Sequence, residues 1–250
     1  MWSQRSFVYK VPILFGILSL SFAELPEGIK KCHYGDSACI LETASTIIAN
    51  YSNGVKELGI PTIDPLVYET ADVKKISSGA LTAQLYLKNL KVYGYSTAKI
   101  YKIEGFTENP TKLEFHYKIP KITLSADYKL RGEFFSIPLN EQGKMNDTIL
   151  NYDYFWNGTV KLVERNNEKY MKLENYRTKF TTSRIYFNFG NLFNGDKVLG
   201  DSANEFFNKN WKILFDTMKP ILNKITGQFF GNLVSEPFSK IPYKQFFLED

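Results

Sequence analysis

Residues 202–235 read SANEFFNKNWKILFDTMKPILNKITGQFFGNLVS, and their apolar side chains recur at three- and four-residue steps. This spacing predicts an amphipathic helix. Ser202 and Glu205 fit a capping box at its start, and Pro220 is expected to kink it on its polar side. At 1.5 Å per residue the helix would be on the order of 50 Å long. Its apolar stripe consists of Phe207, Trp211, Leu214, Met218, Ile221, Leu222, Ile225 and Phe229.

A second amphipathic pattern lies near the N-terminus. From Asp36 or Ser37 apolar residues again recur at helical spacing, until Gly59-Ile60-Pro61 ends the pattern. The spacing predicts a helix of about six turns that ends at a glycine C-cap. Its apolar residues are Ile40, Ala44, Ile47, Ile48, Tyr51, Val55 and Leu58.

Between Leu81 and Phe193 the apolar period changes to two, which predicts strands with one solvated face. The apolar positions are odd-numbered in residues 113–119 and even-numbered in residues 122–130. Pro120 lies at this change of phase, so we expect a bulge or a bend there and a strongly curved sheet. Further alternating segments separated by turn clusters predict an antiparallel meander. They lie around 160–162, 170–173 and 185–189.

The long helix needs more cover than the one other sizeable helix can provide, so the sheet must bury most of its stripe. The predicted fold class is therefore α+β. It has a long C-terminal helix wrapped by a highly curved antiparallel β-sheet, plus one N-terminal amphipathic helix. With 44% hydrophobic and 16% aromatic residues, the chain can bury a substantial core in a single domain.

The first 23 residues have the layout of a secretory signal peptide. The apolar run Val11–Leu20 follows two basic residues, and Ser21 and Ala23 supply small side chains before a cut after Ala23. The alternative is a membrane anchor, but the run is shorter than the roughly 20 residues that a bilayer span needs. We therefore expect residues 24–250 to form one secreted ligand-binding domain.

Cys32 and Cys39 are the only cysteines of the chain. They lie just after the expected cut, in a compartment that oxidises thiols, so we expect them to form a disulfide. Closing a loop of about eight residues contributes roughly 2.5 kcal/mol, which fastens the N-terminus but does not hold up the fold. Three Asn-x-Ser/Thr sequons are candidate glycosylation sites. They are Asn146 and Asn157, expected in loops between strands, and Asn50, expected on the flank of the first helix.

Two stretches come close to catalytic or phosphate-binding motifs. Gly94–Ala98 lacks the last glycine of the G-x-S-x-G nucleophile elbow, and His116, downstream, falls in a strand and is expected to face solvent. Gly195–Gly200 has the spacing of a phosphate-binding loop, but Asp201 stands where that loop needs lysine. His33 is the only other histidine, and no H-E-x-x-H or CxxC occurs. The sequence therefore predicts no enzyme, no metal site and no cofactor.

The chain has a surplus of aromatic residues, with 20 Phe, 16 Tyr and 3 Trp. Core packing explains the helical stripe, but a sheet curled about so long a helix also leaves a channel beside it, and apolar channels are typical lipid sites. Burying about fifteen ligand carbons at ~0.8 kcal/mol each yields roughly 12 kcal/mol, more than association costs of several kcal/mol. The channel candidates are Ile47, Tyr51, Val55, Tyr128, Phe207, Trp211, Leu214, Met218, Ile221, Leu222, Ile225 and Phe229.

Several short motifs are spread along the whole mature chain. They are Leu25-Pro26 before Cys32 and Cys39, Gly59-Ile60-Pro61 with Asp64-Pro65-Leu66, Asn89-Leu90-Lys91-Val92-Tyr93-Gly94, Asn191-Leu192-Phe193-Asn194-Gly195-Asp196-Lys197, Asn208-x-Asn210-Trp211 and Ile241-Pro242-Tyr243. Together they are highly specific, and they resemble those of the insect takeout and haemolymph juvenile-hormone-binding protein family.

The resemblance implies a tubular lipid-binding-like fold, in which a long helix and a curved sheet surround a hydrophobic cavity. Members of that family are secreted carriers of juvenile hormone, related terpenoids or fatty-acid-like molecules. Some takeout relatives are tied to feeding, chemosensation and daily rhythm. The chain lacks the second disulfide of the lepidopteran hormone carriers, which places it nearer the takeout branch. No single hormone-contacting residue is carried over.

The leading hypothesis is a monomeric carrier of a small lipophilic ligand in haemolymph or another extracellular fluid, with an unidentified receptor as a further partner. The alternative is a membrane-surface lipid-transfer or lipid-sensing protein. Stable membrane insertion is not expected, because the sequence shows no basic amphipathic surface helix. A third hypothesis is an interaction module whose cavity is filled by side chains, and a fourth is a hydrolase with an unrecognised site. Basic and acidic residues alternate along most of the chain, so nucleic-acid binding is not expected.

Overall fold

The computed structural model describes residue 25 and residues 29–56, 58–78 and 81–249, so the predicted signal peptide, residues 1–23, lies outside the described residues. The α-helices are α1 (Ser37–Asn50), α2 (Lys197–Lys209) and α3 (Trp211–Lys240), and the short 3-10 helices are η1 (Tyr95–Thr97), η2 (Leu192–Gly195) and η3 (Tyr243–Phe246). The strands are β1 (Leu66–Ser78), β2 (Leu81–Tyr93), β3 (Lys99–Glu104), β4 (Lys112–Phe134), β5 (Ile137–Arg165), β6 (Glu168–Thr181) and β7 (Arg184–Tyr186).

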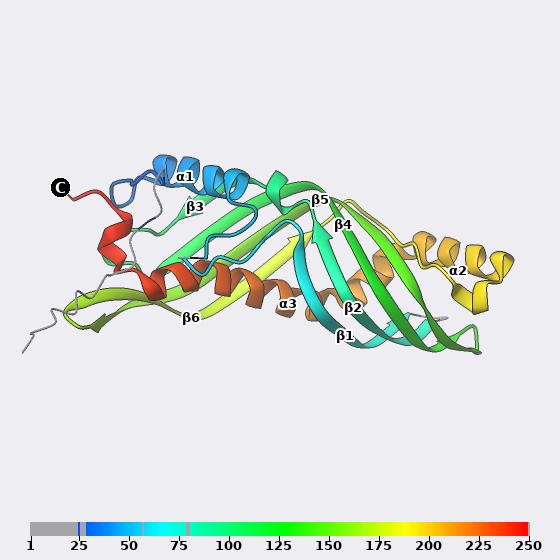
Figure 1. Ribbon diagram of the computed structural model, residues 1–250. Helices are drawn as coiled ribbons and strands as arrows, with labels where there is room; N and C mark the ends of the chain where they lie inside the picture. The colour runs from blue at the N-terminus through cyan, green and yellow to red at the C-terminus, as the bar shows by residue number, and fades with distance from the viewer. Residues whose placement is uncertain (1–24, 26–28, 57, 79–80, 250) are drawn as a thin grey trace, which may run out of the picture.

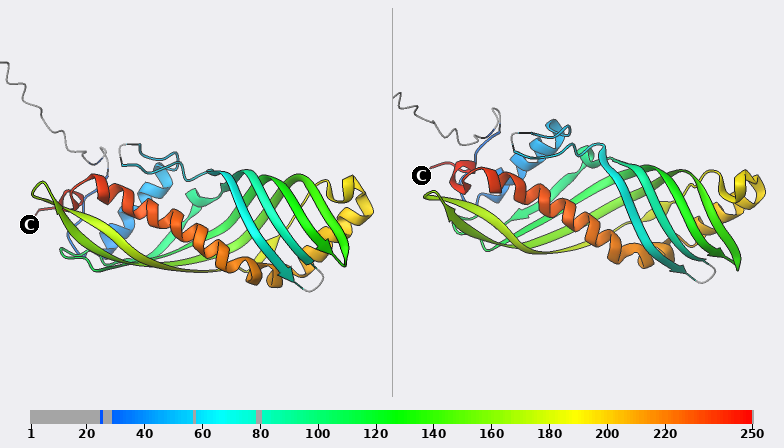
Figure 2. Two further views of the ribbon diagram at one scale, coloured as in Figure 1. Left: turned by 90° about the horizontal axis from the view of Figure 1, so that it is seen from below. Right: turned by 60° about the horizontal axis from the view of Figure 1, so that its bottom comes forward.

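The strands form one antiparallel sheet in the order β1-β2-β4-β5-β6, with β3 beside β4 and β7 beside β5. The long strands β4 and β5 run along most of the elongated molecule, and the sheet curves around α3 (Figure 1). Figure 2 shows α3 along the open side of the sheet, where it contacts both β6 and β1. The predicted fold, a long C-terminal helix wrapped by a highly curved antiparallel sheet, is confirmed.

The change of apolar phase at Pro120 is confirmed. In β4 the buried positions are odd-numbered up to Ile119 and even-numbered from Ile122. The bulge expected there is wrong, because β4 and β5 keep one register through this point. Instead β5 changes phase at the same place, where Asn151 has a φ of 51°. The other neighbour of β4 changes from β3 to β2 there, so the proline, which has no N–H, lies where neither of these two strands pairs with β4.

The predicted start of the C-terminal helix at Ser202 is wrong. The helix α2 begins at Lys197, and the carboxylate of Asp196 accepts a hydrogen bond from the Leu199 N–H at 3.0 Å. An Asp at this position satisfies one of the free N–H groups of the first turn, as a serine would. The helix therefore starts directly after Asp196, which caps it in place of the predicted Ser202.

The predicted single helix is also interrupted. Asn210 has φ −102° and ψ 18°, and it separates α2 from α3. Its side-chain amide donates to the Phe206 carbonyl oxygen at 2.9 Å, which gives the end of α2 a local hydrogen bond. Pro220 lies on the exposed side of α3, as expected. The apolar stripe is thus shared between two helices.

The N-terminal helix is shorter than predicted, because α1 ends at Asn50 and not near Leu58. Gly54 follows with φ 87°, and a Cβ there would lie 2.6 Å from the Ile60 carbonyl oxygen. Val55 and Ile60 then exchange backbone hydrogen bonds of 2.9 and 3.0 Å. The apolar spacing continues past the helix because this tight turn also buries Val55 and Leu58.

Two glycines of α3 allow close packing on β6. A Cβ on Gly227 would lie 2.6 Å from Cε2 of Tyr176, and one on Gly231 would lie 3.3 Å from Cε1 of the same ring. The backbone of α3 can therefore pack closely against β6 at this edge of the sheet. No helix in the described ranges is long and apolar enough to span a membrane.

Candidate ligand-binding cavity

An apolar cavity of about 230 Å³ lies beneath α1, at the end of the molecule that holds the C-terminus. Its walls come from α1, the segment around η1 and β3, strand β4, the second half of α3 and the C-terminal segment. The lining residues are Leu25, Ile29, Lys30, Cys32, Ile40, Thr43, Ala44, Ile47, Ile48, Tyr51, Leu58, Ile60, Ile63, Tyr95, Ala98, Ile100, Ile103, Phe106, Phe115, Tyr117, Phe229, Phe230, Leu233, Val234, Pro237, Phe238, Phe246 and Phe247.

The helix α1 covers this cavity with its apolar face. No residue of α1 is fully buried, although Ile40, Ala44, Ile47 and Ile48 all point to the cavity side and line it. In a solid core such side chains would be enclosed by neighbours on every side. The helix therefore closes a hollow space.

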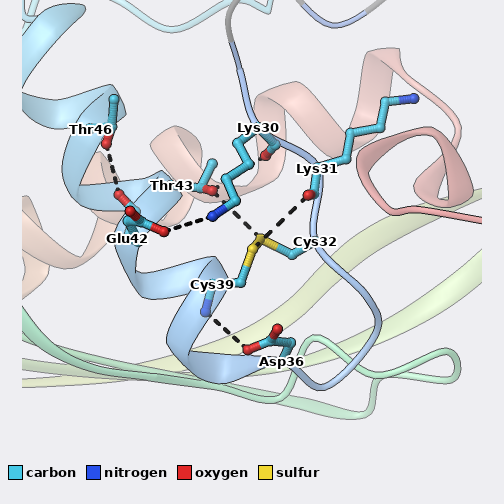
Figure 3. Close-up of a disulfide and its surroundings, with 8 residues drawn as sticks. All are labelled: Lys30, Lys31, Cys32, Asp36, Cys39, Glu42, Thr43 and Thr46. Atoms are coloured by element: carbon cyan, nitrogen blue, oxygen red, sulfur yellow. Dashed lines mark hydrogen bonds and ion pairs between the residues drawn. A yellow bond between two sulfur atoms is a disulfide. The ribbon is translucent and has the colours of Figure 1, made fainter.

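A disulfide holds the start of α1, and it is confirmed. Cys32 and Cys39 join the strap of residues 29–32 to the first turn of the helix (Figure 3). Asp36 caps that turn by accepting a hydrogen bond from the Cys39 N–H at 3.0 Å. On the other side of the strap, the Leu248 N–H donates to the Cys32 carbonyl oxygen at 3.0 Å. The segment around Cys32 and the C-terminal segment thus meet at the end wall of the cavity.

The charge at the cavity is balanced. Lys30 is the one charged residue among the described lining residues, and its ammonium lies 2.8 Å from a Glu42 carboxylate oxygen (Figure 3). Both side chains are exposed, so this pair adds little stability. It does leave the apolar lining without an uncompensated charge.

The inner end of the cavity has a polar character that the sequence did not predict. Tyr95 and Tyr117 line it, and the ring of Tyr154 lies 4.9 Å behind that of Tyr117. The hydroxyls of Tyr152 and Tyr154 are buried outside the lining, near the Thr226 hydroxyl. Burial raises the pKa of the two lining phenols, Tyr95 and Tyr117, so they remain protonated and able to donate. Two neutral hydrogen-bond donors therefore lie in the otherwise apolar lining.

Three of the predicted channel residues line this cavity, namely Ile47, Tyr51 and Phe229. Val55 is buried beside it with Leu58 and Ile241. The remaining candidates do not line it. Ile225 is half-buried, and the others lie in the core or packed against it, namely Tyr128, Phe207, Trp211, Leu214, Met218, Ile221 and Leu222.

Aromatic rings pack against one another in the interior beside α2 and the first half of α3. The rings of Phe180 and Phe215 are 5.3 Å apart, and those of Phe189 and Phe207 are 5.7 Å apart. Tyr128 packs on Phe189 at 4.9 Å and donates from its hydroxyl to the Gly190 carbonyl oxygen. The cavity therefore lies further toward the C-terminus than the sequence suggested. A helical stripe predicts which side is buried, and it does not predict where the opposing side chains leave space.

The placement of two glycosylation candidates was wrong. Asn146 and Asn157 lie within β5 and not in loops between strands. Asn146 is exposed and Asn157 is half-buried. Asn50 is exposed at the last position of α1. The alternation of β5 continues across both sequons, because strands tolerate polar residues on their solvated face.

The near-motifs have structural roles. The Asp64 carboxylate accepts hydrogen bonds from the N–H groups of Gly94 and Ser96 and from the Ser96 hydroxyl, which fixes the turn at η1. The stretch around Gly195 leads into α2, whose first turn is capped by the Asp196 carboxylate. In the residues that the structure describes, no group of His, Cys, Asp and Glu side chains is placed to hold a metal ion.

The known proteins that this chain resembles match it along nearly its whole length. The sequence model of the family described as haemolymph juvenile hormone binding protein matches residues 12–248. The circadian clock-controlled protein daywake of Drosophila melanogaster is 25% identical over 231 residues, which cover 89% of this chain and 88% of that protein. Daywake of Drosophila yakuba is 23% identical, with the same coverage. The crystal structure of Epiphyas postvittana Takeout 1 superposes with a TM-score of 0.74 at 20% identity, over 86% of this chain and 97% of that one.

Proposed function

Because the chain belongs to the haemolymph juvenile hormone binding protein family, we propose that it carries a small lipophilic ligand in the cavity beneath α1. The observation that carries this proposal is the hollow space inside the apolar lining. A well-packed interior would fill that space with side chains. A hollow, mostly apolar space with a few polar groups at its edge is the usual form of a small-molecule site.

The proposed ligand is an uncharged molecule with a long apolar part, such as a juvenile-hormone-like terpenoid or the ester of a long-chain fatty acid. The apolar lining favours hydrocarbon by about 25 cal/mol for each Å² buried. A free carboxylate would lose its hydration inside the cavity. It would also lack a free counter-ion there, because Lys30 already pairs with Glu42. A fatty acid would therefore keep its carboxylate at the solvent end of the cavity.

The phenols at the inner end suggest how the ligand is oriented. Tyr95 and Tyr117 line the cavity and can each donate one hydrogen bond to a ligand, and a buried donor without an acceptor costs about 1–3 kcal/mol. An ester, ketone or epoxide oxygen placed near them would remove that cost. We therefore propose that the polar group of the ligand enters first and that the hydrocarbon lies along α1.

We also propose a non-catalytic, extracellular role. The proposed secretory route rests on the layout of residues 1–23 and on the oxidised pair Cys32–Cys39. On that route the exposed sequons at Asn50 and Asn146 are better placed to carry glycan than the half-buried Asn157. The likeness to a clock-controlled protein suggests measuring the transcript through the day.

Calorimetric titration with a sesquiterpenoid methyl ester, and with the matching free acid, tests this function. The ester should bind to a single saturable site and the acid more weakly. Ala44→Trp fills the cavity from α1 and should weaken ester binding at least ~10-fold, or about 1.4 kcal/mol. Met218→Trp is the matched control, because Met218 lies outside the cavity lining. It should lower stability by ~1–3 kcal/mol through overpacking and leave the affinity of the folded protein unchanged.

Native mass spectrometry of protein from its source tissue would identify the natural ligand class through a co-purifying lipid. Failure of every apolar probe to bind, together with ligand-free protein from tissue, would contradict the carrier function. Equal loss of affinity in Ala44→Trp and Met218→Trp would place the site elsewhere.

A further inference from the structure

Three aromatic rings form the wall between the cavity and strand β5. Phe115, Tyr117 and Phe230 line the cavity, and the centroid of the Phe230 ring lies 5.3 Å from that of Phe115 and 5.7 Å from that of Tyr117. Phe230 also contacts Trp156 and Tyr154 of β5, at 5.4 and 5.7 Å, and neither of these belongs to the described lining. Of the three wall rings, Phe230 is the one that contacts both.

Trp156 holds a buried hydrogen-bond donor behind this wall. Its side chain is 0% exposed, and its Nε1 makes no hydrogen bond in the described part of the chain. A buried indole N–H normally finds a partner, because an unpaired donor is destabilising. The hydroxyl of Tyr154, which lies near that of Thr226, belongs to the same buried layer. An acceptor oxygen that reached this layer would therefore be stabilised there.

The Phe230 ring has space into which it can turn. It borders an open volume of about 230 Å³, and buried side chains exchange between rotamers even in packed interiors. If the ring turned into the cavity, it would leave a space of its own size against Trp156 and Tyr154. One side-chain rotation would thus bring the buried donor into contact with the cavity.

We propose that Trp156 and Tyr154 form an inner subsite, closed by the Phe230 ring, that binds an acceptor oxygen of the ligand. An ester or ketone oxygen displaces the ring and accepts a hydrogen bond from Trp156 Nε1, while the hydrocarbon stays in the apolar cavity. The oxygen is uncharged, because a carboxylate is costly to bury without a counter-ion. The subsite rests on the proposed carrier function, and it adds a donor beyond the lining phenols Tyr95 and Tyr117.

The indole N–H resonance of Trp156, followed in an NMR titration of the mature chain, tests this proposal. Its signal is the one that is missing from Trp156→Phe, and a new hydrogen bond moves such a signal downfield. A sesquiterpenoid methyl ester should move it downfield saturably, and the matching hydrocarbon, which has no acceptor, should not. The Trp211 signal is the internal control, because Trp211 lies outside the described cavity lining.

Two substitutions separate the subsite from general packing. Trp156→Phe keeps a ring and removes the N–H, so it should weaken ester binding about fivefold and leave hydrocarbon binding unchanged. Phe230→Leu replaces the ring that the ester must displace, so it should strengthen ester binding relative to hydrocarbon binding. Phe215→Leu is the matched control, because Phe215 is also buried on α3 and lies outside the described lining. It should leave both affinities unchanged.

Two results would overturn the subsite and leave the carrier function standing. One is a Trp156 signal that does not move downfield in ester-saturated protein. The other is an equal loss of ester and hydrocarbon affinity in Trp156→Phe. If neither ligand binds to the wild type, the carrier function fails together with the subsite.

Discussion

The side-chain amide of Asn208 pairs with both backbone groups of Phe187, as a neighbouring strand would. Its Nδ2 donates to the Phe187 carbonyl oxygen at 2.8 Å, and its Oδ1 accepts from the Phe187 N–H at 2.9 Å. One helical turn earlier, Asn204 pairs with Phe189 in the same way at 2.9 Å for both bonds. Four residues along a helix and two residues along an extended chain span similar distances, so both asparagines can pair at once. These pairs hold α2 against the extended segment beside β5.

This pairing predicts that Asn208→Ala lowers the free energy of unfolding by about 2–4 kcal/mol, because two backbone groups lose their partner together. Denaturant unfolding of both proteins measures the change. Ser202→Ala is the control on the exposed side of α2, and it should cost little because Asp196 caps the helix. Equal losses in the two variants would contradict this role for Asn208.

The close contact between α3 and β6 predicts that Gly227→Ala is destabilising. The new methyl group would lie 2.6 Å from Cε2 of Tyr176, and overpacking of this kind costs about 1–3 kcal/mol, more than the ~1 kcal/mol that alanine gains in a helix. Gly200→Ala in α2 is the control, because its nearest atom would be 3.6 Å away. It should raise the melting temperature, and a similar rise in Gly227→Ala would show that the helix packs more loosely.

A buried carboxyl group predicts a pH dependence of stability. Burial raises the pKa of Asp147 to about 7, and the Asn188 N–H, which donates to this carboxyl at 3.0 Å, lowers it by less. The folded state therefore favours the protonated form. Its contribution to stability is complete below the unfolded pKa of about 4 and falls as pH rises toward 7, by at most about 4 kcal/mol.

Asp147→Asn keeps an acceptor for the Asn188 N–H and removes the titration. The variant should be more stable than the wild type above pH ~7, with the difference shrinking toward pH ~4. Thermal unfolding across this range measures it. A constant difference between the two proteins at every pH would mean that Asp147 does not titrate in this interval.

The inner phenols predict a selective loss of affinity for ligands with an acceptor oxygen. Tyr117→Phe removes one donor from the cavity lining and no volume, so it should weaken binding of a sesquiterpenoid methyl ester by about 1 kcal/mol and leave binding of the matching hydrocarbon unchanged. Tyr128→Phe is the control at the far end, where the hydroxyl already donates to Gly190. Equal effects of Tyr117→Phe on ester and hydrocarbon would contradict the proposed orientation.

Local pattern in the sequence predicted which sides of the helices and strands are buried, although it misplaced the start of α2 and the end of α1. Helical spacing predicted that the stripe from Phe207 to Phe229 faces inward, and the change of phase at Pro120 predicted where β4 changes its buried positions. The short separation of Cys32 and Cys39 predicted their disulfide. Near-complete motif agreement predicted the family and thereby the fold. In each case a few adjacent residues carry the physical signal.

Only the tertiary structure decided the location of the cavity, the break at Asn210 and the pairing of Asn208 with Phe187. Periodicity reports which side of a helix is buried, and it does not report which distant side chains meet that side. A cavity is the space that remains when several remote segments fail to fill a common volume. Met218 lies within the packed core, whereas Phe229 lines the cavity together with the small residues Ala44 and Ala98.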